Sequence, residues 1–202
     1  MPMLVEPVIL YGSRARLEPL GPAHAAGLYS VSQDPDIWAY MPVDPSHSLE
    51  AITTWIEAAL RARAEGQQMP FAIVDVHSGK VVGSTRYLNI APSDYGLEIG
   101  WTWLAREVRR TAVNTECKYL LLRHAFESLG AIRVQLKTDS RNQRSQRAIE
   151  RLGAVREGVL RKQMILENGY QRDAVMYSII ATEWPEVKSG LEEKLLAPPP
   201  EQ

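Results

Sequence analysis

Residues 139–154 read D-S-R-N-Q-R-S-Q-R-A-I-E-R-L-G-A, and this stretch joins the end of a strand, a capped helix and a glycine stop. Directly before it, residues 132–138 alternate apolar and polar side chains, which is the two-residue period of a half-buried strand. Asn142 is a good N-cap, and Gly153 stands where a helix C-terminus favours a left-handed conformation. We therefore predict a strand followed at once by an amphipathic helix. The apolar set of that strand is Ile132, Val134 and Leu136.

Length and composition favour one intracellular domain. The chain has 202 residues, of which 45% are hydrophobic, and this is enough to bury a sizeable core. We predict one domain over residues 1–196 and a flexible tail over 197–202. A net charge of −1 disfavours nucleic-acid binding, and no apolar run reaches the length of a membrane span or has the flanks of a signal peptide. The single cysteine, Cys117, lies in an apolar helical run and is expected to be buried, which fits the reducing cytoplasm.

The coarse pattern predicts strand, helices, three strands, helix, strand, helix and two strands. His77-Ser78-Gly79 and Glu167-Asn168-Gly169 are typical of hairpin turns. Ser48 is expected to cap a long helix and Thr182 a final one. The remaining strands and helices are expected at 14–20, 21–32, 35–40, 71–76, 80–89, 97–104, 115–129, 155–166 and 171–180.

Three further segments extend the pattern of 139–154. They are L-E-I-G-W-T-W-L at 97–104, R-R-T-A-V-N-T-E-C-K-Y-L-L-L-R-H-A-F-E at 109–127, and the closing runs E-G-V-L-R and Y-Q-R-D-A-V-M-Y-S-I. With the order of elements from Arg14 to Leu195, they make the chain resemble the GNAT superfamily of N-acetyltransferases, in particular the branch of ribosomal-protein N-terminal acetyltransferases. The resemblance implies an α+β fold. Its central mixed, mostly antiparallel sheet would splay between the fourth and fifth strands, with helices on its flanks.

The resemblance also implies where acetyl-CoA binds. The pantetheine arm would lie between the 97–104 and 132–138 strands. The pyrophosphate would lie at the helix N-terminus after the 109–114 loop, where unpaired N–H groups and the positive end of the helix dipole favour an anion. Arg147 would reach the 3′-phosphate, or else belong with Arg144 and Arg151 to a solvated helix face. The expected cofactor-binding residues are Ile99, Gly100, Trp101, Thr102, Arg109, Arg110, Thr111, Ala112, Val113, Asn114, Thr115, Asn142, Ser145 and Arg147.

The 109–114 loop departs from the family pattern, because Ala112 and Asn114 stand where glycine would permit a positive φ and close approach to phosphate. Asparagine tolerates a left-handed conformation, whereas alanine does so poorly. Arg109 and Arg110 would supply compensating charge. From this loop alone, two alternatives stay open: a phosphate cradle, or a solvated arginine pair beside an ordinary helix cap.

Three polar residues are the candidates for chemistry. By resemblance, Glu98 would be the general base that takes the amine proton, often through water, whereas the alternation of its strand would place it on the solvent side. Asn142 would hydrogen-bond the pantetheine in addition to capping its helix. Ser145 would protonate the departing CoA thiolate, or else be an ordinary polar residue of a first helical turn. Many relatives use a tyrosine acid at the position of Ile149.

We therefore expect an enzyme that transfers an acetyl group from acetyl-CoA to a primary amine by direct attack in a ternary complex. The amine would be a protein N-terminal α-amine or a small amine, bound by a wall drawn from 37–47 and 167–173. The alternative is a catalytically silent acyl-CoA-binding sensor or partner-binding protein. We expect no metal, because the four histidines lack ligand spacing, and no nucleic-acid or membrane partner. A homodimer is left open.

Overall fold

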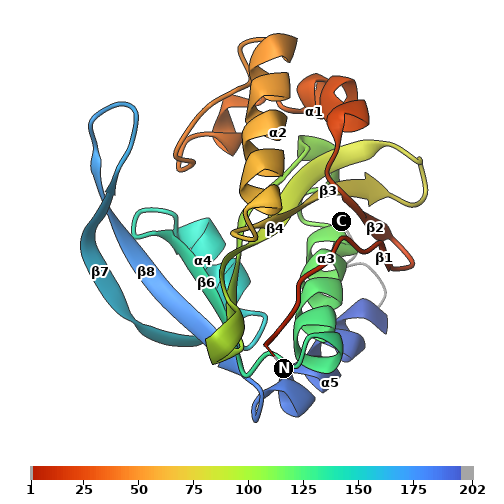
Figure 1. The fold of residues 1–202 in the computed structure, drawn as a ribbon, viewed down its shortest axis with the longest axis vertical. Coiled ribbons are helices and arrows are strands. Elements are labelled where there is room, and N and C mark those ends of the chain that lie inside the picture. The colour runs from red at the N-terminus through yellow and green to blue at the C-terminus, as the bar shows by residue number, and fades with distance from the viewer. Residues whose placement is uncertain (1, 197–202) are drawn as a thin grey trace.

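The computed structural model describes residues 2–196 and contains one eight-stranded sheet with the order β1-β2-β3-β4-β5-β6-β8-β7 (Figure 1). Neighbouring strands are antiparallel except β5 and β6, which are parallel. The predicted mixed, mostly antiparallel sheet is thus confirmed. The predicted tail at 197–202 lies outside the described residues. The strands are β1 (Leu10–Tyr11), β2 (Ala15–Pro19), β3 (Met69–Asp75), β4 (Val81–Ala91), β5 (Gly96–Leu104), β6 (Arg133–Asp139), β7 (Val155–Ile165) and β8 (Gln171–Ile180).

Helices cover both faces of the sheet. Short 3-10 turns occur at η1 (Pro22–His24), η2 (Pro35–Ile37), η3 (Pro92–Asp94) and η4 (Arg106–Val108), and η5 (His124–Ser128) is a π-helical turn that continues α3. Among the helices of residues 2–196, none is long and apolar enough to cross a membrane. The α-helices are α1 (Ala25–Val31), α2 (Leu49–Ala64), α3 (Ala112–Arg123), α4 (Gln143–Glu150) and α5 (Trp184–Leu196).

Two hydrophobic clusters lie on opposite faces of the sheet. The larger one joins α3, α4 and α5 to β-strand residues such as Tyr87 and Val134, and it buries Cys117 as predicted. The smaller one joins α1 and α2 to Ala72 and Trp103. Because side chains alternate along a strand, the residue next to one that faces α3 faces α2. This alternation decides which side of the sheet each site residue occupies.

Several predicted boundaries are wrong by a few residues. The third α-helix begins at Ala112 and not at 115, because Thr111 caps it by accepting a hydrogen bond from the Val113 N–H. Ile132 is 58% exposed, since the strand proper begins at Arg133. Thr182 does not cap the last helix, which begins at Trp184. The strand β1 has only two residues, which is too short for a periodic pattern to predict it from the sequence.

The two expected hairpins and the helix cap at Ser48 are confirmed, since Ser48 accepts a hydrogen bond from the Ala51 N–H. The 35–40 helix is reduced to one 3-10 turn at η2. In Figure 1 the long β7–β8 hairpin stands apart from β2 and β3 across the molecule. Between these two parts of the sheet lie β5 and β6, which pair over only three residue pairs.

Candidate active site

The parallel pairing of β5 and β6 covers three residue pairs and ends at Glu98, opposite Gln135. Beyond this point the two strands diverge. The divergence is the one expected between the fourth and fifth predicted strands, 97–104 and 132–138, which correspond to β5 and β6. A cleft of about 1070 Å³ opens there, at the upper end of the range of about 300–1,000 Å³ for ligand pockets. Residues of β5, β6, α3, α4 and the β7–β8 hairpin line it, so most elements predicted to form the site meet in one place.

A β-bulge turns β5 into this cleft. The register of β4 with β5 shifts between Ser84 and Arg86, and Trp101 in the bulge has a φ of 51°. A left-handed backbone costs a bulky residue free energy, so neighbouring contacts have to hold it. The Arg86 guanidinium lies 4.5 Å from the Trp101 ring and 4.8 Å from that of Trp55, which fixes the bulge from the α2 side.

Glu98 lies at the point where the strands separate and is only 1% exposed, so the solvent-side alternative from its alternation is wrong. The sheet here is covered on both faces, which strand alternation alone cannot reveal. Asn89 Nδ2 and Gln135 Nε2 each donate to Glu98 Oε2 at 2.9 Å, and Lys137 Nζ lies 3.4 Å from the same oxygen. No described residue hydrogen-bonds to Oε1, which lies beside Gly100.

Lys118 is a second buried charge that borders the cleft, from the middle of α3. Lys118 is only 7% exposed, and its Nζ donates a hydrogen bond to Thr102 Oγ1 at 2.6 Å. Thr102 Oγ1 is in turn 2.8 Å from Thr85 Oγ1. Burial lowers the pKa of the Lys118 amine from 10.5 to about 8. The lysine thus ties α3 to the strand just after the bulge.

The first turn of α4 faces the cleft as predicted. Asn142 caps the helix, because its Oδ1 accepts a hydrogen bond from the Ser145 N–H at 3.0 Å. Asn142, Ser145 and Arg147 all line the cleft, as does Ile149 at the position of the missing tyrosine. The two arginines of this helix, Arg144 and Arg147, are exposed.

The segment at 109–115 is built differently from the predicted loop. The positive φ falls on Arg110, at 63°, so neither Ala112 nor Asn114 has to adopt one. Arg109 is tied down, because its Nη1 bonds Asp34 Oδ2 at 2.8 Å and its Nε donates to the Leu104 carbonyl. Of the predicted residues here, those that line the cleft are Arg109, Arg110, Thr111 and Asn114.

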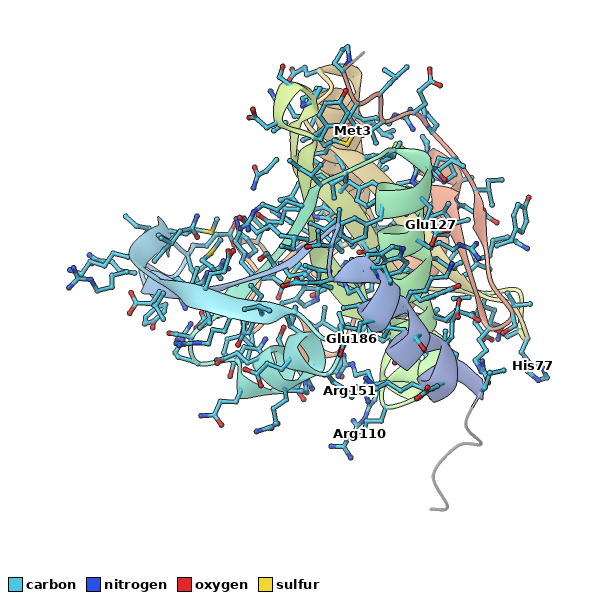
Figure 2. All side chains as sticks on the ribbon, turned by 90° about the horizontal axis from the view of Figure 1, so that it is seen from below. Met3, His77, Arg110, Glu127, Arg151 and Glu186 are labelled. Atoms are coloured by element: carbon cyan, nitrogen blue, oxygen red, sulfur yellow. The ribbon has the colours of Figure 1, made fainter. Side chains whose placement is uncertain are left out.

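The other three predicted residues of this segment support the helix. Val113 is 5% exposed and belongs to the larger hydrophobic cluster, and Ala112 forms the first helical position. Thr115 is 6% exposed and accepts a hydrogen bond from Arg151 Nη2 at 3.3 Å. Figure 2 labels Arg110 and Arg151 at the same end of the molecule, and both border the cleft. This end is therefore cationic.

The opposite end of the cleft is walled by the segments predicted for the acceptor. Arg141 Cζ lies 3.5 Å from the Tyr170 ring centroid and 5.6 Å from that of Tyr40, so the β7–β8 turn and the segment after η2 meet over it. Arg141 also holds Asp139 through Nε and Nη2. A smaller hollow of about 250 Å³ beside this point is lined by residues of 35–44 and 166–168.

Residues 14–155 match the acetyltransferase (GNAT) domain family. The chain belongs to the GNAT acetyltransferases. A GCN5-related N-acetyltransferase from Brucella melitensis has a similar structure, with a TM-score of 0.90 and 29% identity over 96% of this chain and 87% of that one. A structure from T. thermophilus, provisionally named an acetyltransferase, has a TM-score of 0.87 and 42% identity over 96% of this chain and all of that one.

A relative from Bacillus subtilis is YdaF, provisionally named a ribosomal N-acetyltransferase. It is 30% identical over 109 residues, which is 54% of this chain and 58% of YdaF. This chain thus matches just over half the length of that relative. As a GNAT acetyltransferase, the protein takes its acyl group from acetyl-CoA. The elongated cleft and its arginine-rich end have the size and the charge that such an anionic donor requires.

Sequence reasoning missed some polar residues of this GNAT cleft. Lys118 gave a usable signal, because a lysine in an otherwise apolar helical run must reach a partner or water. For Lys137 and Gln135, the sequence indicates only that they belong to the polar half of an alternating strand. Arg172 gives no signal in the sequence, since its burial, at 6% exposure, is a result of tertiary packing.

Proposed function

We propose that the protein acetylates a primary amine, a protein N-terminal α-amine or a small amine, by direct attack on acetyl-CoA bound in the same cleft. One observation carries the proposal: Glu98 is fixed through Oε2 alone, at the point where β5 and β6 separate, and Oε1 is left without a partner among residues 2–196. A carboxylate held in this way has one oxygen with which to take a proton.

The donor would lie across the sheet. Its pantetheine arm would pass between β5 and β6, where the backbone beyond Glu98 is no longer paired to β6. The pyrophosphate would lie at the N-terminus of α3 near Arg110 and Thr111, with Arg147 available to the 3′-phosphate. In this arrangement the bulge at Trp101 aims backbone N–H groups at the thioester, where they would stabilise the developing oxyanion.

Two proton transfers complete the reaction. The amine nitrogen forms a bond to the thioester carbon and loses a proton to Glu98, directly or through a water molecule. The carbon–sulfur bond breaks, and the thiolate of CoA takes a proton from the Ser145 hydroxyl, which solvent then restores. Ser145 faces the cleft from the first turn of α4, and Ile149 cannot take this role.

The pKa values of the possible acceptor amines favour an α-amine over a lysine side chain as the acceptor. With a pKa of about 8, roughly a tenth of an α-amine is neutral at pH 7, whereas under a thousandth of a lysine side chain with a pKa near 10.4 is neutral. One carboxylate with a single unpaired oxygen is enough to take the proton from an α-amine, of which a useful fraction is already neutral. YdaF is provisionally named a ribosomal N-acetyltransferase, and the resemblance to it supports a protein as the acceptor.

The test compares two peptides that differ only in which amine is free. We expect thiol release from acetyl-CoA with a peptide whose N-terminus is free and a rate at least tenfold lower with a blocked N-terminus and a free lysine. Glu98→Gln should lower kcat/KM about a hundredfold, and Glu193→Gln on the exposed side of α5 should leave it unchanged. Equal turnover of both peptides would contradict the α-amine preference. A fully active Glu98→Gln variant would exclude Glu98 as the base.

A further inference from the structure

Arg172 is a buried cation that lines the cleft and forms no ion pair with the described residues. It lies near the start of β8, opposite Met164 of β7, and it is only 6% exposed. No ion pair or hydrogen bond within residues 2–196 involves its guanidinium, and its Nε is buried without a partner. Nevertheless Arg172 is one of the residues that line the cleft.

Of the two nearby carboxylates, Asp139 has partners at both oxygens and Glu98 at one of them, Oε2. Both oxygens of Asp139 accept hydrogen bonds from Arg141, at 3.0 Å to Oδ1 and 2.8 Å to Oδ2. Glu98 Oε2 accepts from two amides and faces Lys137. Three cations, Arg172, Arg141 and Lys137, thus face two carboxylates. Among these five groups, the positive charges outnumber the negative charges by one.

The excess charge lies on the acceptor side of the sheet. Lys137 pairs in register with Met176 and Asp139 with Ala174, so Arg172, two residues further along β8, shares their face. Gln135 and Lys137 on this face bind Glu98, whereas Val134 and Leu136 face α4 in the larger hydrophobic cluster. The helix N-terminus suited to the pyrophosphate, at Thr111, belongs to that opposite face.

An unpaired buried guanidinium is expensive, because removing a charge from water costs several kcal/mol unless a partner compensates. Burial accordingly lowers the pKa of Arg172, and Asp139 and Glu98 offset this only in part. A chain that keeps such a group in a substrate cleft gains from it when an anion binds there. Arginine is the side chain best suited to a carboxylate, which it can bind through two parallel hydrogen bonds.

We infer that the acceptor of this enzyme carries a carboxylate as well as its amine, and that Arg172 binds this carboxylate while Glu98 faces the amine. This inference rests on the proposed function and narrows it. Two kinds of acceptor supply the required chemistry: a free amino acid through its α-carboxylate, or a peptide with an acidic side chain near its N-terminus. Arg172 is then a specificity-determining residue.

Matched acceptors test the inference by binding, apart from turnover. Calorimetry in the presence of CoA compares an amino acid with its amide, and a short peptide starting with Glu with one starting with Gln. We expect at least tenfold tighter binding of the carboxylate member in one of the two pairs, and the pair that responds identifies the source. In Arg172→Met the preference should disappear, and in Arg172→Lys it should be partly restored. The matched control Arg133→Met, at an exposed ion pair, should retain it.

The outcomes separate the two proposals. Acetylation of both members of each pair with no preference would overturn the role of Arg172 and leave the amine acetyltransferase intact. Carboxylate-selective binding without any acetyl transfer would support the Arg172 site and overturn the acceptor class proposed above. Retention of the preference by a folded Arg172→Met variant, verified by its thermal melt, would also overturn the inference.

Discussion

Replacement of Lys118 by methionine should make the folded protein more stable at neutral pH. Methionine keeps the length of the side chain but removes the charge that α3 buries against β5. A pKa lowered from 10.5 to about 8 means that the folded state disfavours the ammonium by about 3 kcal/mol relative to the unfolded chain. The lost hydrogen bond to Thr102 offsets about 1 kcal/mol. Thr102 keeps its partner Thr85, so the expected net gain at pH 7 is about 2 kcal/mol.

The gain should depend on pH in a defined direction. Below pH 8 both the folded and the unfolded wild-type chain hold the Lys118 proton, so the full penalty is present. Between about pH 8 and 10.5 only the unfolded chain holds it, and the free energy of unfolding of the wild type then rises by about 1.4 kcal/mol per pH unit. The advantage of Lys118→Met should therefore shrink from about 2 kcal/mol at pH 8 to about zero near pH 9.5.

Urea unfolding of both proteins at pH 7, 8, 9 and 9.5 measures this difference directly, because all other titrating groups are common to the two chains. Lys80→Met, at an exposed hairpin position, removes the same charge without burial and should show no comparable pH dependence. A difference between Lys118→Met and wild type that stays constant over this pH range would refute the assignment of a lowered pKa. So would a variant that is less stable at pH 7.

Three more substitutions give expectations of different kinds. Gly83→Ala should lower the free energy of unfolding by about 3 kcal/mol, because its Cβ would lie 2.2 Å from the Trp103 carbonyl oxygen; Gly21→Ala, with open space, should have little effect in the same urea titration. Arg110→Gly should relieve a left-handed backbone and stabilise by about 0.5–1 kcal/mol, yet raise the KM for acetyl-CoA severalfold in steady-state assays; an unchanged KM would exclude a phosphate contact. Ser145→Ala should lower kcat about a hundredfold with a nearly constant KM for acetyl-CoA, and an unchanged kcat would exclude Ser145 as the acid.

The fold could be predicted from the sequence because its signals are local. The Asn142 cap, the two hairpin turns and the alternation at 132–138 each specify a few residues, and together they order the elements. The boundaries that were wrong depend on tertiary contacts. The start of α3 depends on whether Thr111 or a later residue caps it, and the exposure of Ile132 depends on where β6 begins to pair with β8.

The site was only partly predictable, since alternation reports one face of a strand and not what covers the other. Glu98 looks solvent-facing in its strand pattern, yet it is only 1% exposed and its partners come from neighbouring strands. The burial of Arg172, which is 6% exposed, is likewise not indicated by the pattern of its strand. The family resemblance supplied the role of Glu98, but it said nothing of the three groups that hold its Oε2.

Four of the buried charged residues of this protein lie around the point where the sheet opens, and this distribution ties stability to function. Arg86 supports the bulge, Lys118 anchors the strand after it, Glu98 lies where β5 and β6 separate, and Arg172 lines the cleft. Each would destabilise a core in which its charge stayed uncompensated. Two of the four, Arg86 and Lys118, contact residues of β5, and the other two are the groups that we propose offer an oxygen and a cation to a substrate. Apolar replacements should therefore stabilise the chain most readily at Lys118, and at Glu98 and Arg172 they should remove the chemistry that a substrate needs.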